Sequence, residues 1–333
     1  MNKFSPEVLG AIKDHRLDCG LALMKCNRHA QAILEFEAVM QLEPSHAMAR
    51  WHRCLALLSI GDYAKGMKEH DAAWELHDWH SRVLGDVEKL LALPLWQGNK
   101  CNLIVYHQEG FGDAIMCMRI LPKLIERCGS VTIIVPFELV SLMNGYDGID
   151  VVTAIPGDCS IFDARVTLFN SMWMLGCITQ KTIPSSPYIS AEFKLGSSDK
   201  KKMGICWSGN AQRNFTLNRF ISYLNVENYE LFSLQKTTIE THGVNPLLSV
   251  DFKATVKLME ILDVIVTVDT SAAHLAGAIG HPNSHVIIPY WRDWRWWNKD
   301  WWYPTLNIYP QEDPADWDIP FGRINEVLMG NSL

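Results

Sequence analysis

The sequence predicts an α/β protein in which two parallel-sheet regions follow an all-α segment. Residues 102–135 and 264–288 each contain a short apolar strand, a turn, a helix and a second apolar strand, the pattern of a parallel β-α-β unit. Ahead of them, residues 13–46 and 47–80 align at an offset of 34, which indicates a helical repeat. We therefore expect three domains, with bounds 1–96, 97–195 and 196–333.

Composition and charge are those of a folded globular protein. Of 333 residues, 48% are hydrophobic and 20% charged, and the net charge is -7 without a long basic run. General attraction to nucleic acid or anionic membranes is therefore not indicated. We expect no signal peptide and no membrane span, because no apolar run is long enough. The nine cysteines form no CxxC pair, which favours reduced thiols and a cytoplasmic location.

The helical repeat resembles the tetratricopeptide repeat. Its small, bulky and helix-ending positions are occupied by Gly20, Ala32, Phe36 and Pro44, but the second copy is degenerate because His70 replaces Phe36. Two repeats bury too little surface to stand alone, so we expect the segment to pack on the domain that follows. It serves either as a structural cap or in recognition of an acceptor or partner.

Two stretches separate the predicted regions. The Pro- and Gly-containing stretch 94–99 predicts a boundary, and the polar stretch 190–201 predicts a hinge between the sheet regions. The predicted strands are Asn102–Tyr106, Val131–Val135, Val151–Val152, Ala164–Leu168, Met203–Trp207, Leu231–Leu234, Leu248–Val250, Val264–Val268 and His285–Ile288. The predicted helices are Ser81–Leu91, Ala114–Arg127, Lys253–Leu262, Ala272–Ile279 and a closing helix, Phe321–Leu328.

The turn after the strand Val264–Val268 is a candidate anion site. Asp269, Thr270 and Ser271 supply capping side chains at the start of the next helix. Free backbone N–H groups at a helix N-terminus, beside the carboxyl end of a parallel strand, favour an anionic group such as a diphosphate. These residues by themselves predict a phosphate site and no more.

The run from Val268 to Pro282, VDTSAAHLAGAIGHP, resembles the donor-phosphate motif of the heptosyltransferase-like glycosyltransferases of family nine. It is most similar to the variety that carries N-terminal tetratricopeptide repeats, a layout shared with the O-linked N-acetylglucosamine transferases. Five motifs in the family's order cover roughly residues 101–310. The resemblance implies the GT-B architecture, in which two Rossmann-like domains face a cleft, preceded here by the all-α tetratricopeptide-repeat segment.

The resemblance also implies a reaction. This is inverting, metal-independent transfer of a sugar from a nucleotide diphosphate to an acceptor hydroxyl, with the nucleotide-diphosphate sugar as co-substrate and no cofactor. The absence of a D-x-D motif near the donor site agrees with a reaction that uses no metal. The acceptor stays open between a glycan, a protein serine or threonine, and a modified nucleobase, which the acidic charge disfavours. The rivals are an inert scaffold that binds a protein partner and, less well supported, a nicotinamide-dependent oxidoreductase.

The turn Gly110–Asp113 is the candidate catalytic element. Asp113 matches the family's Gly-Asp motif, whose aspartate is taken as the base that deprotonates the acceptor hydroxyl, and Gly112 lets the backbone pass close to the ligand. Inverting transfer needs one carboxylate on the acceptor side, because the nucleophile attacks opposite the leaving diphosphate. The simpler alternative is that Asp113 only caps the helix. Ile115 excludes a dinucleotide-binding G-x-G-x-x-G fingerprint.

Further motifs supply the expected donor contacts. The stretches 207–210 and 233–236 resemble the family's W-x-G-N and S-L-Q-K segments. Either Arg213 or Arg219 would stabilise the departing diphosphate, the alternative being a solvated surface arginine. His274 would donate to a phosphate or the sugar, the alternative being a packing role. The expected donor-binding residues are Gly112, Trp207, Ser208, Gly209, Asn210, Arg213, Arg219, Gln235, Lys236, Asp269, Thr270, Ser271, His274, Trp294 and Arg295.

The stretch 290–304 is unusually rich in tryptophan. Residues 293–296 and 302–304 resemble the family's D-W-R-W and W-Y-P, which is why Trp294 and Arg295 are expected at the donor. Six tryptophans within twelve residues exceed what those motifs need, and the alternative is an aromatic core under a long loop. The tryptophans without an assigned role are Trp291, Trp297 and Trp301.

Overall fold

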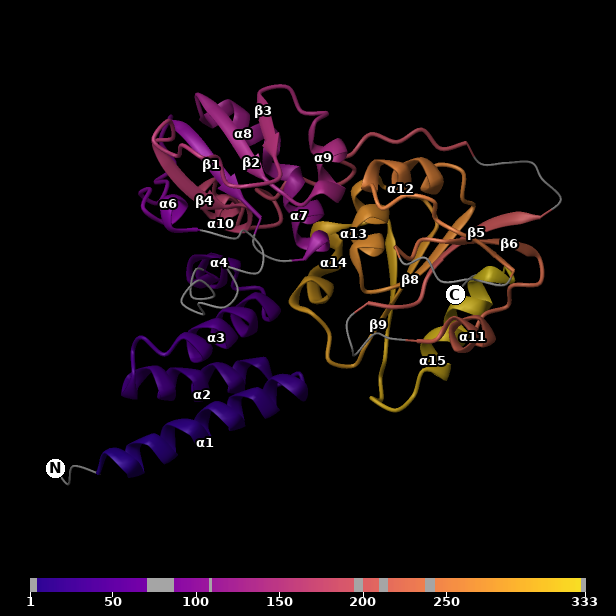
Figure 1. Ribbon diagram of the computed structural model, residues 1–333. Helices are drawn as coiled ribbons and strands as arrows, with labels where there is room; N and C mark the ends of the chain where they lie inside the picture. The colour runs from indigo at the N-terminus through magenta and orange to yellow at the C-terminus, as the bar shows by residue number, and fades with distance from the viewer. Residues whose placement is uncertain are drawn as a thin grey trace.

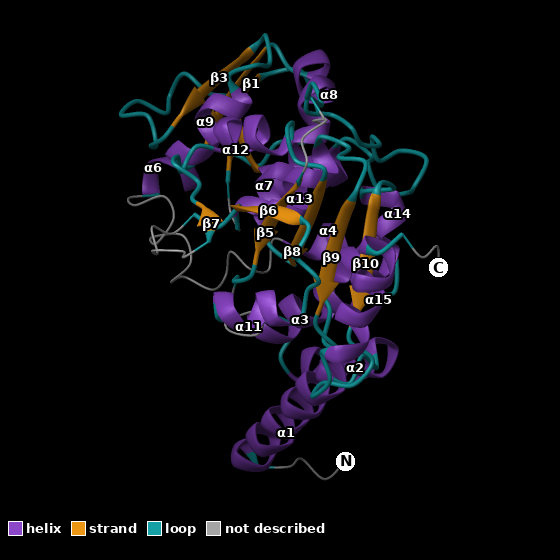
Figure 2. Cartoon of the chain, turned by 90° about the vertical axis from the view of Figure 1, so that its right-hand side faces the viewer, coloured by secondary structure: helices purple, strands orange, loops and turns teal. Residues whose placement is uncertain are grey.

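The computed structural model describes residues 5–70, 87–107, 110–194, 200–209, 215–236 and 243–330, and it is an α/β structure with two parallel sheets. A helical segment leads into the first sheet, and the second sheet comes next in the chain (Figure 1). Helices α7 (Phe111–Cys117) and α13 (Ser271–Ala278) lie between the two sheets in both views (Figures 1 and 2). The two sheet regions therefore meet through helices of both, α7 against α13 and α9 (Phe137–Met143) against α12 (Phe252–Met259).

The N-terminal segment, residues 6–69, consists of consecutive helices packed on one another. Gly20 marks the close crossing expected from the repeat: a Cβ atom there would overlap the buried ring of Phe36. At Gly66 a Cβ atom would lie 2.7 Å from the Leu58 side chain, so small residues set the spacing of both helix pairs. The predicted helix Ser81–Leu91 falls mostly outside the described residues. The described helices are α1 (Pro6–Lys25), α2 (His29–Leu42), α3 (Ala47–Ser59), α4 (Tyr63–Glu69) and α6 (Glu88–Leu91).

The first sheet has the strand order β3-β2-β1-β4, and all neighbours are parallel. The prediction of one helix over Ala114–Arg127 is wrong in its start and its continuity. A 3-10 turn divides it, because Pro122 is tolerated in the first turn of a new helix and would clash inside a continuous one. The elements are β1 (Asn102–Tyr106), α7, η2 (Met118–Ile120), α8 (Leu121–Arg127), β2 (Ser130–Ile134), α9 (Phe137–Met143), β3 (Ile149–Val152), β4 (Ala164–Thr167) and α10 (Leu168–Met174).

The second sheet has the order β10-β9-β8-β5-β6-β7 and is also parallel throughout. The chain runs outward from β5 through β6 to β7, and then returns to β8 on the opposite side of β5. The elements are β5 (Lys201–Cys206), α11 (Leu217–Ser222), β6 (Tyr229–Ser233), β7 (Val244–Asn245), α12 (Phe252–Met259), β8 (Val264–Val268), α13, β9 (Ser284–Ile288), η4 (Trp294–Asn298), α14 (Lys299–Trp302), β10 (Leu306–Pro310) and α15 (Asp318–Leu328).

Two strand predictions for the second sheet need correction. The stretch Leu248–Val250 is not a strand, and Leu248 is 91% exposed. The strand lies earlier, at β7, and Pro246 directly after it cannot donate to a ladder. Conversely, β10 was not predicted: it pairs with β9 at the sheet edge and ends in Pro310, which only an edge strand tolerates easily.

One hydrophobic core joins the parts of the chain. It contains Cys54, Leu58, Tyr63 and Met67 of the helical segment, together with the first sheet, α13 and the aromatic residues around η4. The helical segment is therefore packed against the first sheet region and the tryptophan-rich stretch. A second core lies where α11 and α15 pack on the second sheet, so the predicted closing helix packs against its own sheet, on β9 and β10.

The predicted hinge 190–201 is partly fixed. The backbone N–H of Glu192 donates to Glu260 Oε1 (2.9 Å), and that of Lys194 donates to the Glu260 carbonyl (2.7 Å), while residues 195–199 lie outside the described ranges. All nine cysteines are free, and seven of them are buried. Among the described helices, we find none with the length and apolar character needed to cross a membrane.

Candidate active site

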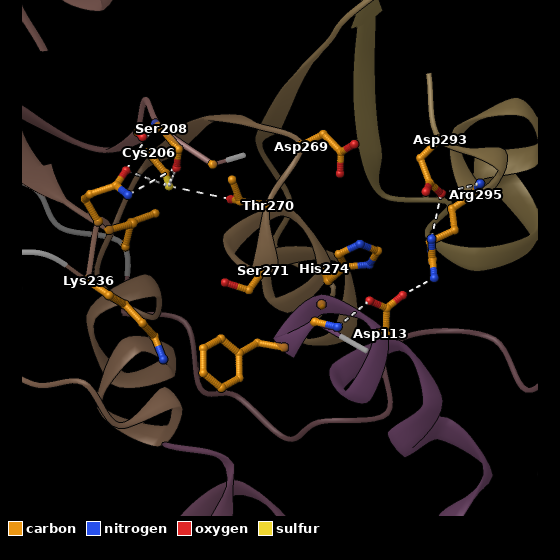
Figure 3. A pocket seen from close by; sticks show the side chains of 16 residues that line it. Asp113, Cys206, Ser208, Lys236, Asp269, Thr270, Ser271, His274, Asp293 and Arg295 are labelled. Carbon is orange, nitrogen blue, oxygen red and sulfur yellow. Dashed lines mark hydrogen bonds and ion pairs between the residues drawn. The ribbon is translucent and has the colours of Figure 1, made fainter. Parts of the chain in front are cut away.

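A cavity of about 560 Å³ lies where the two sheets face each other (Figure 3). In each sheet the strand order reverses beside the first strand, at β1/β4 and at β5/β8, and open parallel sheets bind ligands beyond the carboxyl ends of strands at such points. The cavity is lined by residues at or after the carboxyl ends of β1, β5, β6 and β8, and by two residues of the tryptophan-rich stretch. They are Gly110, Phe111, Gly112, Asp113, Cys206, Ser208, Gly209, Leu234, Gln235, Lys236, Asp269, Thr270, Ser271, His274, Asp293 and Arg295.

Glycine at position 112 allows the two central helices to approach each other, and Gly277 makes room for Tyr303. A Cβ atom on Gly112 of α7 would lie 2.5 Å from His274 Cδ2 of α13, and one on Gly277 would overlap the Tyr303 ring. Gly112 therefore has a packing role as well as a place in the cavity lining: it brings the N-terminus of α7 against α13. This close contact is what puts Asp113 and the Asp269–Ser271 turn into one cavity.

Asp113 is held at both carboxylate oxygens. Its Oδ2 accepts from the Gly110 N–H (3.0 Å), which is the helix-capping arrangement considered from the sequence. Its Oδ1 forms an ion pair with Nη2 of Arg295, a residue of η4. Arg295 also binds Asp293 Oδ1 through Nη1 (2.7 Å), and its guanidinium lies 4.3 Å from the centre of the Trp294 ring. Asp113 thus both caps α7 and lines the cavity, and its carboxylate is oriented by Gly110 on one side and by Arg295 on the other.

His274 is oriented by a chain of buried polar side chains. Its Nδ1 lies 2.9 Å from the hydroxyl of Tyr303, and burial raises the pKa of Tyr303, so that this hydroxyl stays protonated. The neighbouring Tyr188 hydroxyl donates to the Ile115 carbonyl (2.9 Å) and lies 3.5 Å from Nη2 of buried Arg119. The hydrogen bond to Tyr303 fixes the orientation of the His274 ring. His274 thus combines a packing role with a place in the cavity.

The wall formed by the second sheet is held by local hydrogen bonds. The Gln235 side chain accepts from the Ser208 N–H (3.1 Å) and donates to the Ser208 carbonyl (3.1 Å), joining the ends of β6 and β5. The Thr270 hydroxyl accepts from the Ala272 N–H (3.3 Å) and caps α13, as its position predicted. Cys206 Sγ lies 3.3 Å from Gln235 Oε1, which is a further contact between the ends of β5 and β6.

Lys236 is the cation on the far side of the cavity from Arg295 (Figure 3). Its ammonium donates to the Val250 carbonyl (2.8 Å) and lies 3.1 Å from the centre of the Phe252 ring and 4.7 Å from that of Phe111. Burial lowers the pKa of Lys236 from 10.5 to about 8, because it disfavours the charged form. An anion bound beside Lys236 would favour the charged ammonium and raise its pKa again.

Some expected donor residues lie elsewhere. Trp207 is buried in the core on the other side of the second sheet, because successive strand residues point to opposite faces and Cys206 takes the cavity side. Arg219 is exposed on α11, where it stacks near Phe215. Trp294 is buried in aromatic packing and does not line the cavity. The remaining two, Asn210 and Arg213, lie outside the described residues.

Cavity residues that the sequence analysis did not select include Phe111, Cys206, Leu234 and Asp293. Phe111, Leu234 and Asp293 had a usable signal, since each lies within a motif identified from the sequence, whereas Cys206 lies outside those motifs. In the described part of the chain, no group of three or more His, Cys, Asp and Glu side chains is placed to hold a metal ion.

No protein-family model matches the chain, and no curated protein matches it by sequence. Among solved structures it is similar to the E. coli heptosyltransferase WaaC with ADP, at 9% identity over 69% of this chain and 100% of that one, with a TM-score of 0.44. It is also similar to the dodecameric iron-containing heptosyltransferase TibC in complex with ADP-D-β-D-heptose, at 11% identity over 68% of this chain and 66% of that one, with a TM-score of 0.47. A mutant Thermobaculum terrenum O-GlcNAc transferase is similar at 13% identity over 91% of this chain and 81% of that one, with a TM-score of 0.32.

Proposed function

We propose that the chain is a GT-B glycosyltransferase that moves a sugar from a nucleotide diphosphate to an acceptor hydroxyl, with inversion and without metal or cofactor. The observation that carries the proposal is that Asp113 and the 269–271 turn line one cavity from different sheets. An inverting transfer needs this arrangement, since the base and the leaving group must lie on opposite sides of the anomeric carbon.

The residues then take separate roles. Asp113 accepts the proton of the acceptor hydroxyl, and the ion pair with Arg295 orients its carboxylate. The capped N-terminus of α13 and the ammonium of Lys236 receive the diphosphate, where negative charge grows as the bond to the sugar breaks. The Gln235–Ser208 pair fixes the backbone beside the nucleotide.

The same proposal includes domain boundaries at 96/97 and 195/196, tetratricopeptide repeats in the helical segment and a cytoplasmic location. The acceptor is a glycan, a protein serine or threonine, or a modified nucleobase, with the helical segment available to a protein partner. One observation favours the inert scaffold as a second candidate: the ion pair with Arg295 occupies an oxygen that a base must offer. Transfer requires that the acceptor hydroxyl hydrogen-bonds to this carboxylate while Arg295 stays paired with it.

The test is a panel of uridine, guanosine and adenosine diphosphate sugars, followed by thermal unfolding and by hydrolysis of the sugar. We expect at least one donor to raise the unfolding temperature and to be hydrolysed slowly. Thr270→Val should abolish that rise, whereas Thr216→Val, which removes an equivalent cap from α11, should keep it. Failure of every donor to bind would reject the transferase and favour the scaffold.

A further inference from the structure

We propose that Tyr63 of α4, in the helical segment, positions the Asp113 carboxylate through the two residues of η4 that lie between them. Those residues are Trp294 and Arg295. The proposal rests on the proposed function for its catalytic meaning, but its structural part can be tested without it. It makes the helical segment a component of the reaction centre.

The ring of Tyr63 is inserted among the aromatic side chains of η4 and α14. It is 1% exposed, and its ring lies edge-on to those of Trp301 (5.2 Å), Trp302 (5.7 Å) and Trp294 (5.8 Å between centroids). Its hydroxyl accepts from Trp302 Nε1 (3.4 Å), and burial raises its pKa. Trp301, which had no role in the sequence analysis, thus contacts the helical segment.

Two more contacts join the helical segment to this stretch. Asn27 Nδ2 donates to the Tyr290 carbonyl (2.8 Å), and the ring of His29 meets that of Trp297 at 5.5 Å. Asn27 adopts a positive φ of 57°, which asparagine tolerates, and this turn between α1 and α2 presents its amide to Tyr290. The stretch that carries Arg295 is therefore held by the helical segment at more than one point.

Trp294 lies between Tyr63 and Arg295 and contacts both. The indole is 3% exposed and is bounded by Tyr63, by Phe169 (5.8 Å) and by Trp302 (5.5 Å). The Arg295 guanidinium lies on its face at 4.3 Å. Removing the Tyr63 ring would leave a void beside the indole, into which it could relax, and the guanidinium would move with it.

Arg295 sets one side of the Asp113 carboxylate. Asp293 Oδ1 accepts from both the backbone N–H (3.0 Å) and Nη1 (2.7 Å) of Arg295, which leaves Nη2 to pair with Asp113. A displacement of about 1 Å at a catalytic group can cost about 100-fold in rate. The position of Tyr63 is therefore expected to matter for turnover more than for donor binding.

The test compares Tyr63→Ala with Phe36→Ala in the full chain. Both remove a buried ring from the helical segment, but Phe36 belongs to the separate cluster between α1, α2 and α3. The first readout is the ¹⁵N NMR signal of the Arg295 guanidinium, assigned with Arg295→Lys. We expect slow guanidinium rotation in the wild type and in Phe36→Ala, and fast rotation in Tyr63→Ala.

The second readout is the kinetics of transfer. We expect Tyr63→Ala to lower kcat by about 10- to 100-fold with the donor KM little changed, and Tyr63→Phe, which keeps the ring, to restore it. If Tyr63→Ala does not fold, Tyr63→Leu provides the same comparison. An unchanged Arg295 signal in a folded variant, or an equal loss in Phe36→Ala, overturns the positioning role. A selective loss in a protein that transfers no sugar supports that role and rejects the proposed function.

Discussion

The two walls of the cavity are held in different ways. On the second-sheet wall, Gln235 is tied to Ser208 and Thr270 caps its own helix, so each contact joins neighbouring strand ends or adjacent residues. On the α7 wall, Asp113 pairs with Arg295, 182 residues further along the chain, and Arg295 rests on aromatic rings that the helical segment supports. The second-sheet wall is therefore held by contacts within its own sheet region, whereas the α7 wall depends on how distant parts of the chain pack.

The largest effect is expected from Asp113→Asn, which keeps the shape and the acceptor for the Gly110 N–H but removes the charge. We expect kcat to fall by about 10²- to 10⁴-fold while the donor Kd stays nearly constant. Single-turnover transfer and calorimetric donor binding measure the two quantities. Asp293→Asn, which removes the other carboxylate on Arg295, is the control and should cost less. Turnover near the wild-type value in Asp113→Asn would remove this residue from the mechanism.

The contact between the walls is tested by Gly112→Ala. The added methyl group would lie 2.5 Å from His274 Cδ2, so α7 and α13 must separate. We expect a loss of about 1–3 kcal/mol in the free energy of unfolding, measured by urea denaturation, together with weaker donor binding. Gly157→Ala, at a position with no atom within 4 Å of the new methyl group, should be close to neutral. Equal stability of the two variants would contradict the close packing of the walls.

The independence of the second-sheet wall from the α7 wall is tested by Gln235→Ala. Loss of the amide leaves the Ser208 N–H and carbonyl without this partner, and we expect donor KM to rise by about 10-fold, equivalent to about 1.4 kcal/mol. Because this bond lies within the second-sheet wall and does not reach Asp113, kcat should change much less. Gln97→Ala removes a comparable amide–backbone bond outside the cavity and should leave KM unchanged. A fall in kcat without a rise in KM would mean that the two walls are not separable.

The smallest effect is a pH dependence of donor affinity. Lys236 has its pKa lowered to about 8 by burial, and a bound diphosphate would favour its charged form and raise that pKa again. Binding therefore takes up a proton as the pH passes 8. We expect the Kd of an intact sugar nucleotide to be flat from pH 6 to 7.5 and to rise at most about tenfold per pH unit above 8. Lys236→Met should flatten the profile; an unchanged profile would exclude Lys236 as the titrating group.

Many residues of the site could be predicted from short stretches of sequence. The residues from Asp269 to Ser271 line the cavity because a strand end and a helix start fix their place, and Gln235 and Lys236 come after β6 for the same reason. Prediction failed where a side chain had two directions available. Trp207 and Trp294 both neighbour cavity residues in the chain, yet both side chains pack into cores.

By itself, the sequence determined the β-α-β units, most strand positions and the capped turns, because apolar periodicity, proline, glycine and capping residues act over a few residues. Only the tertiary structure decided that Arg295 meets Asp113, that Trp294 faces Tyr63, and that the Lys236 ammonium lies against two phenylalanine rings. Each of these depends on the packing of side chains far apart in the chain, and such packing is fixed by shape and burial that no local pattern records.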